Sequence, residues 1–337
     1  MTPERIIQVG MGFWPARTLQ VATKLGLFTA LEKAPMTGAQ IAAALGLATR
    51  AVPDFPDALV ALKFLEREGD GNEAVYSNSE EAATFLTKGS PAYVGGFLEM
   101  AHDRLYPFWA DLDKGLRTGH PQNESSRGMR SIFETVYSDP EGLQQFLAAM
   151  SGISTGNFVA LAEKFDFSRY QTLCDIGGAE GVLSIEVARA NFHMHCTTAD
   201  LPPVAPIAQR KIAAAGLSDR VDTAVVDFFT DPFPRADVIT MGMILHDWDL
   251  PTKGMLIGKA YDALPEGGAF IVVEQLIDDA RRENAFGLMM SLNMLIEGGA
   301  ASDYTGADFA EWCTEAGFSS CQVLHLAGPS SAAIAYK

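Results

Sequence analysis

A glycine-rich turn follows a short apolar run near the middle of the chain. It reads Leu173-Cys174-Asp175-Ile176-Gly177-Gly178-Ala179-Glu180-Gly181, and a helical pattern begins directly after it. Glycines at Gly177, Gly178 and Gly181 let a backbone approach a bound molecule closely, and the start of a helix offers unpaired N–H groups. A dinucleotide fingerprint would need glycines at positions 179 and 182, but the chain has Ala179 and Val182 there. The turn therefore favours a ligand other than a dinucleotide.

Acidic residues stand at the ends of three consecutive strand candidates: Asp175, Asp200 and Asp227. The carboxyl ends of parallel strands form one crevice, in which such sheets bind ligands. Asp175 would repel a pyrophosphate but attract the ammonium group of a methionine moiety. Asp200 could accept both ribose hydroxyls, and Asp227 could accept the adenine amino group while Phe228 covers the ring. Each acid alone could be a surface carboxylate, but together they favour S-adenosylmethionine over NAD.

One histidine is placed to act as a base beside this crevice. Of the six histidines, only His246 stands at the end of a strand candidate that faces it, within Gly242-Met243-Ile244-Leu245-His246-Asp247-Trp248-Asp249. An imidazole with an ordinary pKa of about 6.5 is a neutral base near neutral pH, whereas a phenol with a pKa of about 10 stays protonated. Removing a hydroxyl proton in this way accelerates a reaction by roughly 10²–10⁴-fold. His246 is therefore the candidate general base.

The hydrophobic patterning in the second half of the chain predicts the elements that position these residues. Strand-like runs alternate with helical ones, and two further strand-like runs end the chain. The strand-like runs are 172–176, 195–200, 221–226, 237–241, 269–276, 320–326 and 332–336, and the helical runs are 182–191, 204–215 and 252–264. This alternation predicts an α/β fold with a Rossmann-like, doubly wound sheet. The final antiparallel hairpin fits the methyltransferase form of this sheet better than the nicotinamide-binding form.

The first half of the chain has mainly helical patterning. Helices are predicted over 16–33, 39–45 and 58–68, with Gly26 tolerated inside the first, Thr37 as an N-cap and Gly46 as a C-cap. A short strand over 73–77 would complete a winged-helix-like unit. A helical pattern over 93–164 contains a polar break at 117–130. We therefore predict a mainly helical, winged-helix-like N-terminal domain over 1–100, connecting helices over 101–168 and a cofactor-binding catalytic domain over 169–337.

The composition excludes several classes of partner. The 337 residues carry 42 acidic and 25 basic side chains, so the formal net charge of −17 disfavours nucleic acid and anionic membranes. Residues 37–90 contain eight acids and four bases, which argues against DNA reading despite the expected winged-helix shape. The chain has no Cys-x-x-Cys pair, a polar N-terminus and no apolar run near the roughly 20 residues of a membrane span. We expect a cytoplasmic protein with reduced thiols. The His193-x-His195-Cys196 run lacks a plausible fourth metal ligand.

Four motifs carry a resemblance to a known family. They are Asp175-x-Gly177-Gly178-x-x-Gly181, Asp200-Leu201-Pro202, Asp227-Phe228-Phe229 and Leu245-His246-Asp247-Trp248. Their order and spacing resemble those of the S-adenosylmethionine-dependent small-molecule O-methyltransferases of plants and bacteria. That family includes the caffeate, hydroxyindole (acetylserotonin) and polyketide O-methyltransferases. Leu264-Pro265-Glu266-Gly267-Gly268, Leu292-Asn293-Met294 and Ala316-Gly317-Phe318 extend the resemblance, so it covers nearly the whole chain.

The resemblance implies a metal-independent homodimer that binds S-adenosylmethionine and releases S-adenosylhomocysteine. It also implies that the N-terminal domain over 1–100 is the dimerisation domain, with interlocked helices. His246 would be the base, flanked by Glu274 and Asp303. The family usually has Glu-Arg-Thr where this chain has Asp303-Tyr304-Thr305, and it often has a basic residue where Gly242 and Met243 stand. The implied cofactor-binding residues are Asp175, Gly177, Gly178, Gly181, Asp200, Leu201, Asp227, Phe228 and Met241.

The run 286–294 is rich in methionine, whose thioether adapts to flat ligands but serves equally well as core filler. The substrate-pocket candidates are Trp248, Phe286, Met290, Asn293 and Met294. We therefore expect a small hydroxyl acceptor of aromatic or polyketide-like character. Two alternatives stay open. One is a cofactor-binding relative with non-methylating chemistry, such as a decarboxylase, hydroxylase or cyclase, since fold does not fix reaction. The other is a winged-helix regulator that responds to a ligand.

Overall fold

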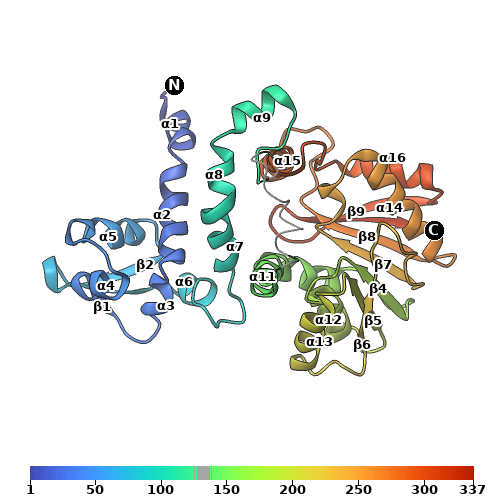
Figure 1. Cartoon of the computed structure of the whole chain (residues 1–337), viewed down its shortest axis with the longest axis horizontal. Helices are drawn as coiled ribbons and strands as arrows, with labels where there is room; N and C mark the ends of the chain where they lie inside the picture. Colours follow the sequence, from blue (N-terminus) through green and yellow to red (C-terminus); the bar gives the residue numbers. More distant parts are fainter. Residues whose placement is uncertain (125, 127–136, 138) are drawn as a thin grey trace. The chain divides into compact units, whose positions relative to one another are not determined.

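The computed structural model describes residues 1–124, 126, 137 and 139–337, and it divides into two compact units (Figure 1). The first unit comprises Met1–Pro107 and the second Phe108–Lys337. None of the described helices combines the length and apolarity that a transmembrane helix requires.

The N-terminal unit packs helices around a small antiparallel sheet. Its strands β1 (Met36–Thr37), β2 (Leu65–Glu68) and β3 (Val75–Asn78) lie in the order β1-β3-β2. The helices are α1 (Glu4–Gly10), α2 (Phe13–Lys24), α3 (Leu27–Ala30), α4 (Gly38–Leu45), α5 (Asp54–Ala61), α6 (Glu80–Phe85) and α7 (Gly95–Met100). Phe28, Leu59 and Tyr76 are among the fully buried residues of its core. The apolar pattern of this part of the sequence therefore builds a separate hydrophobic core.

Two helix predictions in this unit are wrong, and two capping predictions are confirmed. The predicted 16–33 helix breaks because Gly26 adopts a left-handed φ of 76° between α2 and α3. The predicted 58–68 helix stops at Ala61, Lys63 takes a left-handed φ of 70°, and 65–68 becomes β2 instead. Thr37 forms a capping box with Gln40 at the start of α4, and Gly46 ends that helix in the left-handed region.

The second unit is built on a seven-stranded sheet in the order β6-β5-β4-β7-β8-β10-β9. The strands are β4 (Thr172–Ile176), β5 (His195–Asp200), β6 (Val221–Val225), β7 (Val238–Gly242), β8 (Ala269–Glu274), β9 (Ser320–His325) and β10 (Ser331–Tyr336). The first five strands along this order are parallel, and β10 pairs antiparallel with both β8 and β9. The predicted α/β class, with a Rossmann-like sheet and a C-terminal antiparallel hairpin, is confirmed.

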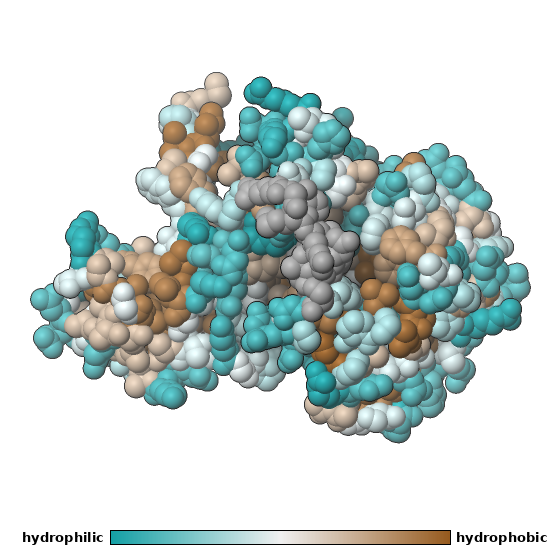
Figure 2. Space-filling model, in the orientation of Figure 1, coloured by the Kyte–Doolittle hydropathy of each residue, from teal (hydrophilic) through white to brown (hydrophobic). Residues whose placement is uncertain are grey.

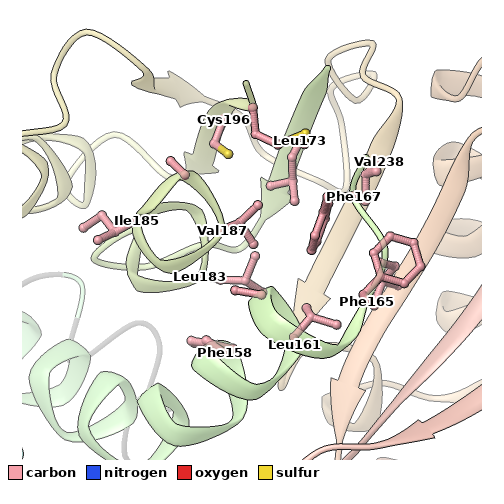
Figure 3. Packing of buried hydrophobic residues seen from close by; sticks show 14 of the residues in the cluster. Phe158, Leu161, Phe165, Phe167, Leu173, Leu183, Ile185, Val187, Cys196 and Val238 are labelled. Carbon is pink, nitrogen blue, oxygen red and sulfur yellow. The ribbon is translucent and has the colours of Figure 1, made fainter. Parts of the chain in front are cut away.

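Helices cover both faces of this sheet (Figure 1). One face is covered by α11 (Pro140–Lys164), α12 (Val182–Ala190) and α13 (Ala205–Ala214). The other face is covered by α14 (Leu250–Ala263) and α16 (Gly306–Ala316). Neighbouring strand residues point to opposite faces, so Leu173 joins one core cluster and Cys174 the other. Figure 3 shows Phe158, Leu161 and Phe165 at the end of α11 packing beneath this sheet with Leu173 and Leu183. The predicted strand–helix alternation thus gives a sheet whose central strands are buried on both faces, while its edge strands β6 and β9 are partly exposed.

The predicted helical region over 93–164 contains α7, a π-helical turn η3 (Ala101–Leu105), α8 (Tyr106–Trp109), α9 (Leu112–Thr118) and α11. The later part of the predicted break at 117–130 lies largely outside the described residues. Beyond the sheet, α15 (Ala285–Gly298) packs against the 3-10 turn η5 (Leu245–Asp247) that carries His246. The fold therefore brings the methionine-rich segment to the candidate base.

Candidate active site

The strand order reverses between β4 and β7, and the first candidate acid lies at this switch point. Asp175 on β4 pairs in register with Thr240 on β7, and its Oδ1 accepts a hydrogen bond of 2.7 Å from the Thr240 hydroxyl. Burial raises the pKa of Asp175 to about 7; the Thr240 hydrogen bond opposes this rise and nearby Asp200 adds to it. A buried carboxyl in this state becomes fully ionised when a cation binds close to it. The geometry thus suits Asp175 to a positively charged ligand.

The glycine-rich turn after β4 depends on missing side chains for its own packing. Gly177 and Gly181 have left-handed φ angles of 69° and 78°, which other residues rarely adopt. A Cβ on Gly178 would lie 2.1 Å from the Thr198 hydroxyl and 2.8 Å from Asp175 Oδ2. The N–H groups of Gly177 and Gly178 both donate to the Ala199 carbonyl. The loop is therefore held close against β5, and its glycines are explained by protein packing as well as by ligand approach.

Asp200 ends β5 beside this turn. Its Oδ2 accepts from the Ala179 N–H at 2.9 Å and its Oδ1 from the Leu201 N–H at 2.7 Å. Burial raises the pKa of Asp200, and these two backbone hydrogen bonds act in the opposite direction. Each oxygen keeps acceptor capacity, because a carboxylate offers about four lone-pair sites. Asp200 is thus fixed in place and still able to accept hydrogen bonds from a ligand.

Asp227 and Phe228 begin the loop after β6. The Asp227 carboxylate accepts from the Phe229 N–H at 2.9 Å, and the Asp227 N–H donates to Asp231. The Phe228 and Phe229 rings meet the Trp248 ring edge-on, at centroid distances of 5.8 and 4.8 Å. Lys259 donates from α14 to the carbonyls of both phenylalanines. Trp248, predicted as a substrate-pocket residue, therefore packs against the loop predicted to hold the adenine.

His246 is buried, and carboxylates lie on both sides of its ring. Its Nδ1 lies 3.2 Å from Asp303 Oδ1, and its Nε2 lies 3.4 Å from Asp247 Oδ1. Its backbone N–H donates to Glu274 Oε1 at 3.2 Å. Because Glu274 ends β8, the sheet itself anchors the turn that carries the histidine. The structure thus brings His246, Glu274 and Asp303 together, as predicted, and adds Asp247.

The carboxylates around His246 determine the protonation of its imidazole. Burial alone would lower the pKa of His246, but Asp247, the Asp303 hydrogen bond and Glu274 outweigh it and raise the pKa from 6.5 to about 10. Burial raises the pKa of Asp247 to about 6, although the facing histidine opposes that rise. Burial also raises the pKa of Glu274. The carboxylates around His246 therefore favour its protonated form, whereas the sequence alone suggested an ordinary, neutral imidazole.

Two further residues border this acidic cluster. Lys253 is only 1% exposed, and its Nζ donates to the Trp248 carbonyl while lying 5.8 Å from the centre of the Tyr304 ring. Burial and the facing Glu274 carboxylate raise the pKa of Tyr304 well above its usual value. Tyr304 thus occupies the position of the family's usual arginine, and a lysine from another element lies over its ring.

The predicted substrate residues on α15 differ in exposure. Phe286 is 44% exposed, Met290 is half-buried and Met294 is 7% exposed. The Asn293 Oδ1 accepts a 2.8 Å hydrogen bond from the Trp109 indole, which leaves its amide N–H groups to contact a ligand. Met241, predicted to contact the cofactor, is fully buried in the core at the end of β7.

Sequence reasoning missed Lys253, Thr240 and Tyr137. Lys253 lies on the same buried stripe of α14 as Leu256, Ile257 and Ala260, so a lysine on an apolar helix face was the available signal. Thr240 was likewise detectable as the polar residue in the otherwise apolar β7. Tyr137 lies close enough to Asp200 and Asp247 that burial and these two charges raise its pKa, but nothing in the sequence around it gave a comparable signal.

Comparisons with known proteins agree with this geometry. A family model described as the O-methyltransferase domain matches residues 109–319, and one described as the O-methyltransferase dimerisation domain matches residues 7–88. The tetracenomycin polyketide synthesis 8-O-methyl transferase TcmO of Streptomyces glaucescens is 40% identical over 335 residues, covering 99% of this chain and 97% of that protein. The 3-hydroxy-5-methyl-1-naphthoate 3-O-methyltransferase of Streptomyces sahachiroi is 34% identical over 330 residues, covering 98% and 93%.

A solved structure is similar as well. The human N-acetylserotonin methyltransferase in complex with S-adenosylmethionine matches with a TM-score of 0.92 at 27% identity, covering 99% of this chain and 97% of that one. These matches confirm the resemblance drawn from the four motifs. The chain belongs to the O-methyltransferase family, and it carries both the O-methyltransferase domain and the dimerisation domain of that family.

Proposed function

We propose that this enzyme transfers the methyl group of S-adenosylmethionine to a hydroxyl of an aromatic, polyketide-like acceptor, with His246 as general base and without a metal. The observation that carries the proposal is the buried imidazole between Asp303 and Asp247 at the end of β7, one strand from the Asp175 crevice. S-adenosylmethionine, when bound, supplies an activated methyl group on a positively charged sulfur. The protein then needs to position the two reactants and remove one proton.

Asp303 sets the state of the histidine for this task. Its carboxylate accepts the Nδ1 proton, so Nε2 is left as the nitrogen that takes the acceptor's hydroxyl proton. Asp247, 3.4 Å from Nε2, stabilises the imidazolium that results. Glu274 holds the backbone of the same residue. The three acids thus orient one base and stabilise its charged form.

The raised pKa of His246 suits a phenol in particular. A phenol has an ordinary pKa of about 10, and the pKa of His246 is raised to about 10. Each unit by which the pKa of the base lies below that of the phenol adds about 1.4 kcal/mol to the cost of proton transfer, so a raised pKa of His246 makes the transfer easier than an ordinary imidazole would. The positive charge of the bound cofactor acts in the opposite direction and favours the neutral imidazole, which is the form that can accept the proton.

The described residues fit the cofactor. Asp175 offers a buried carboxylate to its ammonium group, and Asp200, beside Leu201, offers fixed acceptors to the ribose hydroxyls. Gly177, Gly178 and Gly181 keep the turn free of side chains, while Phe228 and Asp227 lie at the end of β6 for the adenine. Met241 would contribute through its place at the end of β7, because its side chain belongs to the core.

The acceptor would lie along α15 next to His246. Met290, Met294 and Phe286 would provide an adaptable apolar surface for a flat ring system, and Trp248 would border it. The Asn293 amide group would donate to a ring substituent. The similarity to relatives named for a tetracenomycin polyketide and a naphthoate supports an aromatic acceptor. Within the described residues, no group of three histidine, cysteine or acidic side chains is arranged to hold a metal ion.

We further infer that the enzyme is a homodimer formed through its N-terminal unit. The dimerisation family model covers residues 7–88. Large apolar side chains on α1 and α2 are exposed, among them Ile6, Val9 and Trp14. Figure 2 shows this hydrophobic surface along the N-terminal helices. Sedimentation equilibrium should give twice the mass of the chain, and a monomer at micromolar concentration would contradict the inference.

The test of the proposed function is transfer of isotopically labelled methyl from S-adenosylmethionine to a panel of acceptors. The panel should contain polycyclic phenols, simple catechols, aryl amines and aryl carboxylic acids, each with and without EDTA. We expect labelled methyl ethers from phenols, unaffected by EDTA. Tight cofactor binding without transfer to any acceptor would favour a non-methylating reaction instead. Labelling of amines alone would contradict the choice of a hydroxyl.

A further inference from the structure

Lys253 is a buried charged group that the mechanism above leaves without a role. It lies on the apolar stripe of α14, where a lysine that served only solubility would instead point to solvent. Its Nζ donates to the Trp248 carbonyl and lies 5.8 and 6.0 Å from the centres of the Tyr304 and Trp312 rings. A single carbonyl and two aromatic faces are weak compensation for a desolvated ammonium. Its position therefore needs a further explanation.

The charges that face Lys253 belong to the groups around His246. Asp247 from η5, Glu274 from β8 and Asp303 from the loop after α15 each act on it, as does Asp249 at the N-cap of α14. Within the described part of the chain, Asp303 Oδ2 is buried without a hydrogen-bond partner. Asp249 is exposed, Asp247 is about a quarter exposed, and Glu274 and Asp303 are buried. The cluster around His246 therefore contains three carboxylates, Asp247, Glu274 and Asp303, which His246 and Lys253 balance.

This balance matters most when His246 is neutral, the state in which it can accept a proton. The three carboxylates then face Lys253 as the remaining cation of the cluster. Without Lys253 the loss of the histidine proton would leave three negative charges around one ring, two of them on buried side chains. Like charges that share a largely buried site disfavour ionisation, so the proton would stay on the histidine or move to a carboxylate.

We propose that Lys253 is a positioning residue for the reaction: its buried ammonium offsets the carboxylates around His246 and so allows the histidine to release its proton in the working pH range. The inference rests on the proposed function, because it concerns the same base. Lys253 acts through Asp247, Glu274 and Asp303 and does not touch the acceptor.

The main test replaces the charge and keeps the length of the side chain, in Lys253→Met. Selective carbon-13 labelling of histidine allows the protonation of His246 to be followed by NMR, with His246→Gln used to assign its signal. We expect the pKa of His246 to rise by about one unit or more in Lys253→Met. The acidic limb of the kcat–pH profile should move to higher pH by the same amount, with KM for the cofactor nearly unchanged.

Lys337→Met is the matched control. Lys337 also donates to backbone carbonyls, of Tyr261 and Leu264, and lies 4.2 Å from the centre of the Tyr261 ring. It follows Tyr336, which pairs with Ala269 at the start of β8, whereas Glu274 lies at the other end of that strand. The control should leave the His246 titration and the pH profile unchanged. Lys253→Arg, which keeps the charge, should restore most of the wild-type profile, and it serves as the second variant if Lys253→Met does not fold.

An unchanged His246 pKa in folded Lys253→Met would overturn the inference, as would activity lowered equally at every pH. Either result would reduce Lys253 to a structural anchor for the Trp248 carbonyl. Because the NMR titration needs no turnover, it also separates this inference from the proposed function. A failure of that function would appear as full methyl transfer by His246→Gln, or as no methyl transfer by the wild type to any acceptor, whatever the titration shows.

Discussion

Replacing Asp303 with asparagine removes one charge from His246 and keeps the shape of the side chain. The asparagine carbonyl can still accept the Nδ1 proton across the present 3.2 Å contact. An opposite charge at this distance typically shifts a pKa by about 1–3 units, or roughly 1.4–4 kcal/mol. The pKa of His246, now raised to about 10, should fall accordingly.

The sign of the kinetic effect follows from the role of the base. Methyl transfer needs neutral imidazole, so activity rises with pH through the pKa of His246, and a lower pKa moves that rise to lower pH. The weakened base should also reduce the plateau of kcat by about 10–100-fold, a part of the 10²–10⁴-fold that general base catalysis provides. The two pH profiles should therefore differ in shape as well as in height.

The assay is a kcat–pH profile measured with saturating labelled S-adenosylmethionine, with thermal melts confirming that each variant is folded. Asp303→Glu keeps the charge, so the rise of kcat with pH should occur at the same pH as in the wild type. If the Asp303→Asn profile could be superposed on the wild-type profile by scaling alone, Asp303 would not control the protonation of His246, and the reasoning about the carboxylates would be refuted.

Two further predictions concern the cofactor crevice. Asp200→Asn should weaken S-adenosylhomocysteine binding by about tenfold or more in calorimetry, because it removes charge-assisted acceptors worth roughly 1.5–3 kcal/mol; an unchanged Kd would remove Asp200 from the cofactor site. Gly178→Ala should destabilise the fold by about 1–3 kcal/mol, since the new Cβ would lie 2.1 Å from the Thr198 hydroxyl. Gly258→Ala on α14, where a Cβ meets no atom within 4 Å, is the control and should be neutral or slightly stabilising in urea denaturation. Equal stability of the two alanine variants would contradict the packing explanation.

The sheet was predictable because its signals are local. The central parallel strands β7 and β8 are buried on both faces, so they appear as short apolar runs, and turn residues separate the strands from the helices that follow. The ends of these strands then determine where Asp175, Asp200 and His246 lie. The 58–68 segment shows the opposite case: its apolar spacing suits a helix, but antiparallel pairing of Leu65–Glu68 with β3 outweighs that local preference.

The side-chain contacts and charges of the site could not be predicted from the sequence to the same extent. Nothing in the spacing indicates that Trp109, far away in the chain, would donate to Asn293, or that Trp248 would pack on Phe228 and Phe229. The pKa of His246 depends on three carboxylates from three separate segments. The sequence shows that these acids are present but not how close they lie to the imidazole. Lys253 could have been identified from the sequence, because a charged residue on the buried face of a helix is uncommon and indicates a buried group of opposite charge.

The most direct test of the account is single-turnover methyl transfer by His246→Gln, in enzyme first shown by calorimetry to bind S-adenosylhomocysteine as the wild type does. A glutamine fills the imidazole's place and can still form hydrogen bonds, but it cannot take a proton. If His246 is the general base, we expect this variant to methylate a phenol at least a hundredfold more slowly than the wild type. Much of the lost rate should return at high pH, where the phenol is already ionised. A rate equal to that of the wild type at neutral pH would contradict this role of His246.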